Sequence, residues 1–510
     1  MKLKLEFRLL HPNCQQQKPT NIIHSYIKSL AALHFLPSLR EREREREISV
    51  SIPMGDATDR DHPTPHILIV TYPSQGHINP MLQFSKHLYK RGLKITLILT
   101  NFIARVSHSL PPFPILTISD GYDHGGFASA ESAQTYLDSF RRFGSQSLRE
   151  LLRHLSSSAS PADCLIYDSF LPWVLDVANE LQIATAVFFT QSCAVANIYY
   201  HVHKGLIDLP LPNREIEIPG LPLMKPAEFP SFIYQLGTYP AYYDLLVNQY
   251  ANVDKADWIL CNTFEELERE VLEYLKKIWP SIRAIGPSIP SGYLDGRIEG
   301  DREYGMSILD LDGDVSRKWL EGRRKGSVVY VSFGSIGKVA AEQMEEMAGC
   351  LKSIDRQFLW VVRPSEVVKL PKNFMVETEE KGLVVSWCQQ LEVLTHEAIG
   401  CFVTHCGWNS TLEGVSLGVP MVTVPGWTDQ TTNAKFITDV WKVGLKALAN
   451  SDGVVKREVL LQCIEEVMVG ERGSEIRQNA TIWKTMTQNT FESGGSFNGV
   501  VDEFLAKMVR

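Results

Sequence analysis

Short apolar runs alternate with segments of helical periodicity from about residue 65 onward. Each run is continuous rather than alternating, which is typical of a parallel strand buried on both faces. In the first half the runs are His66–Val70, Lys94–Thr100, Asp163–Asp168 and Thr185–Thr190. Between the first two, apolar residues from Met81 to Leu88 fall on one side of a helix that Gly92 ends. Strand, helix and strand in this order predict βαβ units in a doubly wound α/β domain.

The second half repeats the rhythm. Its apolar runs are Ser327–Phe333, Phe358–Arg363, Leu383–Ser386 and Ile399–Thr404. A helical pattern with Met344, Met347 and Leu351 on one face follows the first of them. The sequence therefore predicts a second doubly wound domain, and two such domains facing each other define a cleft.

The segments outside these domains differ in composition. At residues 40–47 the Arg-Glu pair repeats four times, so we expect residues 1–64 to be a low-complexity, disordered extension. A simple GA nucleotide repeat encodes such a run, and we hypothesise that residues 1–53 are translated leader and that Met54 is the working start; a targeting peptide is the alternative. Residues 288–314 are polar and rich in Gly, and we place the interdomain linker at 301–325.

Composition narrows the class of protein. A chain of 510 residues favours two domains. The net charge of −8 argues against a nucleic-acid partner or a membrane-surface patch. Nine cysteines without a CxxC pair favour reduced thiols and a cytoplasmic location. We find no apolar run of membrane-spanning length and no clear secretory signal, and we expect no membrane span and a monomer.

The stretch from Trp387 to Gln430 carries the strongest chemical signal. The run Ile399–Thr404 leads through a Gly turn into a helix for which Ser410 suits the N-cap and Glu413 the capping-box position. Such a helix start directs free backbone N–H groups at an anion. An ordinary strand–loop–helix would explain single polar residues here, but not the ordered set. Zinc is not expected, because the intervening strand keeps Cys401 and His405 from converging simply.

Two further residues follow strands of the first half. His77 lies in a predicted loop after the strand His66–Val70, and Asp168 ends the strand Asp163–Asp168. The carboxyl ends of parallel strands meet at the ligand-binding edge of a sheet, so the carboxylate could orient the imidazole. A surface His and a helix-capping Asp are the alternatives. Neither GxGxxG nor a Walker pattern is present, which argues against a dehydrogenase or a P-loop enzyme.

In order and length, the stretch Trp387–Gln430 resembles the signature box of plant family 1 glycosyltransferases, which use UDP-sugars. Gln389 stands where that family usually has Pro, and Gly426 where Gln is common. The resemblance implies two Rossmann-like domains facing across a cleft, the GT-B type. It implies an acceptor-binding domain at 65–300, a UDP-sugar-binding domain at 326–485, and a C-terminal helix at 486–510 that packs back on the first domain.

The resemblance also implies roles for individual residues. His77 would be the catalytic base and Asp168 its partner. Ser335, His405, Asn409 and Ser410 would face the diphosphate, and Glu413 the ribose. The remaining donor-binding residues are Thr190, Trp387, Cys388, Gln390, Gly407, Trp408, Asp429 and Gln430, of which Trp387 would stack on uracil and the last three would hold the sugar.

These expectations combine into one function. The chain would transfer glucose from UDP-glucose, with inversion, to a hydroxyl or carboxylate of a small hydrophobic plant metabolite such as a phenolic, an aromatic acid or a terpenoid. UDP-glucose would be a co-substrate, and no metal or other cofactor is expected. The alternatives are another UDP-sugar on the same fold and an inert sugar-nucleotide sensor.

Overall fold

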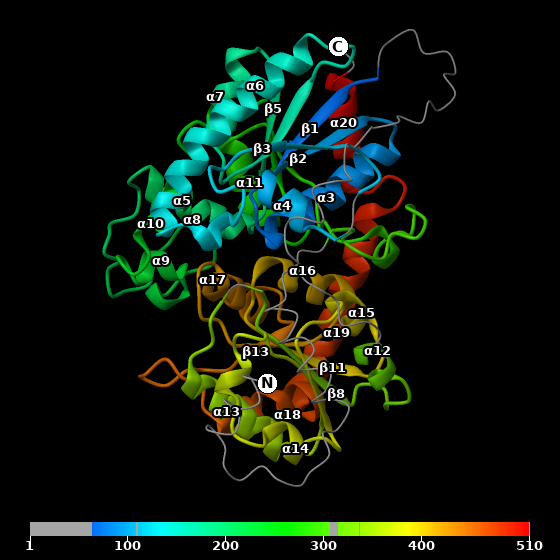
Figure 1. Cartoon of the computed structure of the whole chain (residues 1–510). Helices are drawn as coiled ribbons and strands as arrows, with labels where there is room; N and C mark the ends of the chain where they lie inside the picture. Colours follow the sequence, from blue (N-terminus) through cyan, green and yellow to red (C-terminus); the bar gives the residue numbers. More distant parts are fainter. Residues whose placement is uncertain (1–63, 109–110, 307–314, 336, 509–510) are drawn as a thin grey trace, which may run out of the picture. The chain divides into compact units, whose positions relative to one another are not determined.

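The computed structural model describes residues 64–108, 111–306, 315–335 and 337–508 (Figure 1). Both sheets belong to one compact unit. The predicted leader at 1–53, the Met54 start and all of the predicted extension except Thr64 lie outside the described residues.

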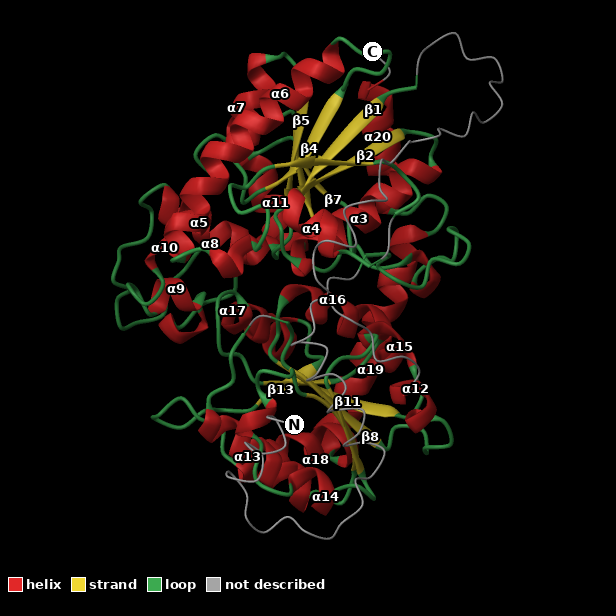
Figure 2. Cartoon of the chain, in the orientation of Figure 1, coloured by secondary structure: helices red, strands yellow, loops and turns green. Residues whose placement is uncertain are grey.

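The first sheet has seven parallel strands in the order β3-β2-β1-β4-β5-β6-β7. They are β1 (His66–Val70), β2 (Lys94–Thr100), β3 (Ile115–Ile118), β4 (Cys164–Asp168), β5 (Ala184–Phe189), β6 (Trp258–Cys261) and β7 (Ile282–Ala284). Every residue of β1 and β4 is buried, because helices cover both faces of the sheet (Figure 2).

The second sheet has six parallel strands in the order β10-β9-β8-β11-β12-β13. They are β8 (Val328–Ser332), β9 (Gln357–Val361), β10 (Gly382–Val385), β11 (Ile399–Thr404), β12 (Met421–Thr423) and β13 (Gly444–Lys446). The eight runs predicted from the sequence coincide with strands to within two residues. The fold is therefore the predicted one, two Rossmann-like α/β domains.

Helices connect the strands in both halves. In the first half they are α3 (Gln75–Lys90), α4 (Asn101–Val106), α5 (Ala133–Ser139), α6 (Ser145–Ser156), α7 (Trp173–Glu180), α8 (Cys193–His203), α9 (Ser231–Tyr234), α10 (Pro240–Asn248) and α11 (Arg269–Ile278). From the predicted linker onward they are α12 (Val315–Leu320), α13 (Ala341–Ser353), α14 (Phe374–Glu377), α15 (Gln390–Thr395), α16 (Trp408–Leu417), α17 (Gln430–Lys435), α18 (Arg457–Val469), α19 (Glu471–Phe491) and α20 (Ser496–Met508).

The C-terminal helices join the two halves. Helix α19 packs against α16 and α18 of the second half. Helix α20 lies beside the first sheet (Figure 1), where Phe497, Val501 and Phe504 are buried in the same apolar cluster as Ile67 of β1. On its polar side Glu503 pairs with Arg283 of β7 at 2.8 Å. The last segment of the chain is therefore part of the core beneath the first sheet.

Candidate active site

His77 lies in the first turn of α3, and the predicted loop at this position is wrong. The helix starts at Gln75 after an extended N-cap, Ser74, and it contains Pro80. Gly and Pro near the start of a helix look like a loop in sequence; Gly76 lies in the first turn of α3, whereas Pro80 lies one turn further on, inside the helix. Since proline has no N–H, the carbonyl of Gly76 lacks its usual partner four residues on. That carbonyl accepts a hydrogen bond from Nδ2 of Asn409 at 2.8 Å.

The imidazole of His77 is held by a buried carboxylate. Its Nδ1 lies 2.7 Å from Oδ2 of Asp168, which is fully buried at the end of β4. Oγ1 of Thr190 lies 3.1 Å from the same nitrogen, and the ring of Phe170 packs beside the imidazole. With Nδ1 engaged, Nε2 is the nitrogen that can take up a proton from a substrate.

Asp168 is not the N-cap of the helix that follows it. Helix α7 has Pro172 at its N-cap, and Oδ1 of Asp168 accepts from the backbone N–H of Phe170 at 2.9 Å. The helix-capping alternative for Asp168 is therefore wrong. The carboxylate instead divides its two oxygens between its own turn and the imidazole.

A cavity of about 450 Å³ opens in front of His77. Aromatic side chains form much of its wall, among them Tyr72, Phe170, Phe232, Tyr242 and Trp427. Ten of the predicted site residues line it: His77, Thr190, Ser335, His405, Gly407, Trp408, Asn409, Ser410, Asp429 and Gln430. We call this space the histidine cavity; its aromatic wall suits a small hydrophobic ligand.

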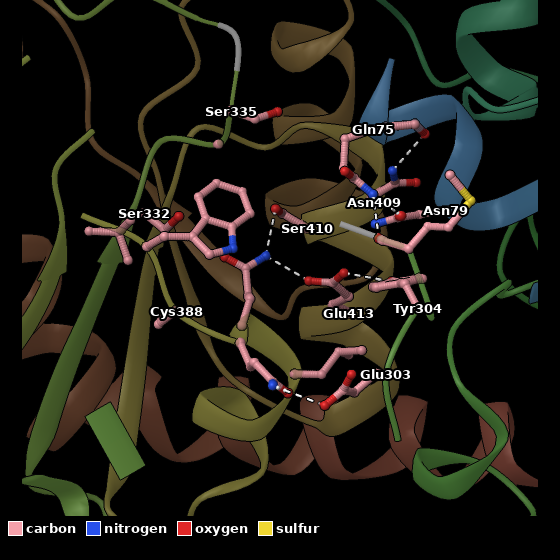
Figure 3. Close-up of a pocket in the computed structure, with 18 of the residues that line it drawn as sticks. Gln75, Asn79, Glu303, Tyr304, Ser332, Ser335, Cys388, Asn409, Ser410 and Glu413 are labelled. Carbon is pink, nitrogen blue, oxygen red and sulfur yellow. Dashed lines mark hydrogen bonds between the residues drawn. The ribbon is translucent and has the colours of Figure 1, made fainter. Parts of the chain in front are cut away.

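A second cavity, of about 210 Å³, is drawn in Figure 3 and shares lining residues with the first. It is lined by Trp387, Cys388, Gln390 and Glu413, together with Ser335, Asn409 and Ser410, which line the histidine cavity too. We call it the box cavity. The two spaces therefore meet at Ser335, Asn409 and Ser410, and the predicted residues all lie around them except Asp168, which reaches the site through His77.

The start of α16 differs from the prediction. The helix begins at Trp408 with Gly407 at the N-cap and no side-chain cap among the described residues, so Ser410 is not the N-cap and no capping box forms. Instead Nε2 of Gln390 donates to Oγ of Ser410 at 2.8 Å and to Oε2 of Glu413 at 2.6 Å. Because glycine offers no side-chain acceptor, the N–H groups of the first turn remain available to a ligand, as expected for an anion site.

Two glycines flank the imidazole of His405. Burial lowers the pKa of its imidazole to about 4. A Cβ added to Gly334 or Gly407 would lie 2.6 or 2.5 Å from Nε2 of the ring. The two glycines therefore leave the space that the imidazole occupies, with Nε2 between the loop after β8 and the start of α16.

The predicted sugar-binding residues are held in different ways. Trp408 donates its indole N–H to the backbone carbonyl of Asn262 at 2.7 Å, so that group is committed to a contact with the first half. Burial raises the pKa of Asp429 to about 6, and its carboxylate accepts from Asn433 at 2.7 Å. Oε1 of Gln430 accepts from the backbone N–H of Trp427 at 2.9 Å, which fixes the amide at the cavity wall.

Some residues of the site carry no sequence signal. Tyr304, in the predicted linker, donates its hydroxyl to Oε1 of Glu413 at 2.7 Å. Tyr330 of β8 donates to Oε1 of Gln390 at 3.0 Å. The linker has no periodicity, and any single aromatic residue between Pro210 and Tyr250 is more typical of a core than of a pocket. Only the folded chain distinguishes Phe232 and Tyr242, which line the histidine cavity.

Two features are absent from residues 64–108, 111–306, 315–335 and 337–508. No helix there has the length and apolar character needed to cross a bilayer. Among the same residues, no group of three or more His, Cys, Asp or Glu side chains is arranged to hold a metal ion.

Comparisons with known proteins agree on a family. Residues 317–479 match the model for UDP-glucuronosyl and UDP-glucosyl transferases. The chain is 45% identical over 450 residues to the flavonol 7-O-beta-glucosyltransferase UGT74F1 of Arabidopsis thaliana, covering 87% of this chain and 98% of that one. It is 42% identical over 450 residues to mogroside I-E synthase of Siraitia grosvenorii, with the same coverage. The crystal structure of Os79 from O. sativa with UDP matches with a TM-score of 0.82 at 36% identity, covering 87% of this chain and all of that one.

Proposed function

The chain belongs to the family of UDP-glucuronosyl and UDP-glucosyl transferases and is a UDP-glycosyltransferase, and we propose that it transfers glucose from UDP-glucose to a small hydrophobic acceptor with inversion at the anomeric carbon. The acceptor is a hydroxyl or carboxylate of a plant phenolic, aromatic acid or terpenoid. The names of the flavonol and mogroside enzymes support this acceptor class.

One observation carries the proposal: the histidine cavity and the box cavity share Ser335, Asn409 and Ser410. A nucleotide in the box cavity would place its diphosphate at this junction, against the start of α16. The sugar would then extend into the histidine cavity, where His77 and the aromatic wall receive the acceptor. In the proposed complex, a base, an acceptor and an activated sugar would therefore share one connected space.

The mechanism follows from these positions. His77 accepts the proton of an acceptor hydroxyl at Nε2 while the oxygen attacks the anomeric carbon, a contribution of roughly 10²–10⁴-fold. Asp168 stabilises the imidazolium that forms. The bond to the diphosphate breaks as the new bond forms, and the N–H groups of α16, His405, Asn409 and Ser335 stabilise the leaving charge. We propose that these donors suffice without a metal.

Residues that line the two cavities would make the remaining contacts with the UDP-sugar. We propose that Trp387 stacks on uracil, that Cys388 and Gln390 reach its edge, and that Glu413 binds the ribose hydroxyls. Asp429 and Gln430 would hold the glucose, with Thr190, Gly407 and Trp408 close to it. Among the described residues that line the histidine cavity, none is Lys or Arg. This favours glucose over glucuronate, whose carboxylate would lack a cationic partner there.

We also propose an arrangement for the whole chain. Residues 65–300 bind the acceptor, 326–485 bind the UDP-sugar, 301–325 link the two, and 486–510 return to the first domain. The protein would act as a monomer in the cytoplasm. Burial of seven of the eight described cysteines, with no disulfide among those eight, supports a reducing location.

An assay with labelled UDP-glucose and an acceptor panel tests the proposal. Product should form with a phenol, an aromatic acid or a terpenoid alcohol, and NMR of the product should show a β-glucoside from the α-linked donor. UDP-xylose, UDP-rhamnose and UDP-glucuronate serve as rival donors. Binding of UDP-glucose without transfer to any acceptor would favour the sensor, and retention of the α configuration would exclude direct displacement.

A further inference from the structure

Tyr304 contacts the buried carboxylate of the box cavity from outside the signature box. The two oxygens of Glu413 have different partners: Oε1 accepts from the Tyr304 hydroxyl at 2.7 Å and Oε2 from Nε2 of Gln390 at 2.6 Å (Figure 3). Desolvation raises the pKa of Glu413, while these two bonds lower it. The phenol therefore favours the ionised carboxylate, the form that accepts hydrogen bonds most strongly.

The carboxylate keeps room for a ligand in this arrangement. Two carboxylate oxygens offer about four acceptor sites, and Tyr304 and Gln390 use one on each oxygen. One site on each oxygen is left, which matches a vicinal diol that donates two parallel hydrogen bonds. The phenol oxygen can itself accept one more bond, because it donates its single hydrogen to Glu413.

The segment that carries Tyr304 is firmly placed. Residues 301–306, which we call the strap, lie along α3. Lys86 of α3 pairs with Asp301 at 2.6 Å, and both side chains are buried. Gln83 donates to the backbone carbonyls of Glu303 and Tyr304 at 3.2 and 3.1 Å. The strap is thus fixed to the helix that carries His77 and reaches from there to Glu413.

We propose that Tyr304 is a positioning residue of the donor site, which holds Glu413 ionised and oriented for the vicinal hydroxyls of the nucleotide ribose. The inference rests on the proposed function, because it takes a uridine diphosphate sugar as the ligand of the box cavity. It adds a specific role for the strap: donor affinity depends on a hydroxyl supplied from outside the signature box. Loss of that hydroxyl weakens ribose recognition and leaves the diphosphate and base contacts in place.

Calorimetry with two ligands tests the inference. UDP carries the ribose diol, and 2′,3′-dideoxyuridine diphosphate lacks it. Tyr304→Phe should weaken UDP binding about tenfold, as expected for a lost hydrogen bond to a charged group, and change binding of the dideoxy analogue less than twofold. The KM for UDP-glucose should rise by a similar factor, with kcat within threefold of wild type. Tyr304→Leu, which also lacks the hydroxyl, should give the same pattern.

Tyr274→Phe is the matched control. Tyr274 is also half-buried, and its hydroxyl lies 3.2 Å from Nε2 of His201, away from both cavities. This variant should bind both ligands as wild type does. The inference is overturned if Tyr304→Phe leaves UDP affinity unchanged, or weakens both ligands by the same factor. If those results come from a wild type that binds UDP and transfers glucose, the proposed function stands; a wild type that does not bind UDP overturns both.

Discussion

Asn409 donates its side-chain amide to the backbone carbonyl of Gly76 at 2.8 Å, which ties the start of α16 to the turn that carries His77. The carbonyl is open to this contact because Pro80 cannot supply the helical N–H that would otherwise reach it. The proline within α3 therefore leaves the Gly76 carbonyl free to accept the hydrogen bond from Asn409 in the other half. This hydrogen bond connects the turn proposed to carry the base with the proposed diphosphate site.

Replacing Pro80 by Ala should raise the stability of the protein and lower its activity. The new N–H would bond to the Gly76 carbonyl within α3 and compete with Asn409. We expect a higher Tm, because a proline in a helix interior costs up to about 3 kcal/mol, together with a several-fold lower kcat/KM. Thermal melting and steady-state kinetics measure the two effects. A variant that gains stability at full activity would show that the Asn409–Gly76 contact is dispensable.

His77→Ala should abolish most turnover on phenol and alcohol acceptors, by roughly 10²–10⁴-fold. Carboxylate acceptors are already ionised near neutral pH, so their turnover should fall much less. Asp168→Asn should follow the same order with a smaller loss, because an amide does not balance the charge of an imidazolium. Thr190→Val, which removes the second contact at Nδ1, is the milder control. Initial rates with matched phenol and benzoate acceptors test this prediction. An equal loss of rate for both acceptors would argue against His77 as a general base.

The apolar runs of the sequence predicted the central strands well. Parallel strands such as β1 and β11 are buried on both faces and therefore appear as continuous apolar stretches. The three-residue strands β7, β12 and β13 leave no comparable signal and were not predicted. The start of α3 was missed because Gly76 and Pro80 suggest a loop. In the folded chain a helix begins at Gln75, after Ser74 at the N-cap, and Asn409 donates to the carbonyl of Gly76 that Pro80 leaves without a partner.

The site was predictable where its residues are close in sequence. Trp387–Gln430 presents its polar groups in one ordered stretch, and all of its predicted members reach the two cavities. Tyr304 was not predictable, because its contact with Glu413 depends on where the strap lies between the halves. The N-cap at Ser410 was predicted by side-chain preference, but Gly407 takes that position and Ser410 bonds to Gln390.

Because of Asp429, affinity for UDP-glucose should fall as the pH is lowered, whereas the stability of the fold should rise. Burial raises the pKa of Asp429 from 3.8 to about 6, so below about pH 6 the carboxylate becomes protonated and would be a weaker acceptor for the hydroxyls of the proposed glucose ligand. The KM for UDP-glucose should rise as the pH falls through 6. A carboxyl whose folded pKa is raised stabilises the protein fully below its unfolded pKa, and that contribution is lost as pH rises through the folded value.

At pH 7.5 Asp429→Asn should therefore be more stable than wild type, with a free energy of unfolding higher by up to about 3 kcal/mol and a correspondingly higher Tm. The difference should shrink through pH 6 and vanish below about pH 4. The same variant should show a high KM for UDP-glucose at every pH, without the step near pH 6. Melting curves and donor kinetics from pH 4 to 8 measure both. A stability difference that does not vary with pH would contradict the raised pKa.

Phe504→Ala should show that α20 belongs to the core of the first half. The side chain is buried and packs against Trp258 of β6 with ring centroids 5.4 Å apart. Its loss should lower the free energy of unfolding by about 3–5 kcal/mol, measured by urea titration with Trp fluorescence. Glu503→Gln is the control on the same helix, because the half-exposed pair with Arg283 should contribute no more than about 1 kcal/mol. Since Phe504 lines neither cavity, kcat and KM of the folded fraction should stay near wild type. A small destabilisation equal to that of the control would mean that the helix is attached only loosely to the sheet.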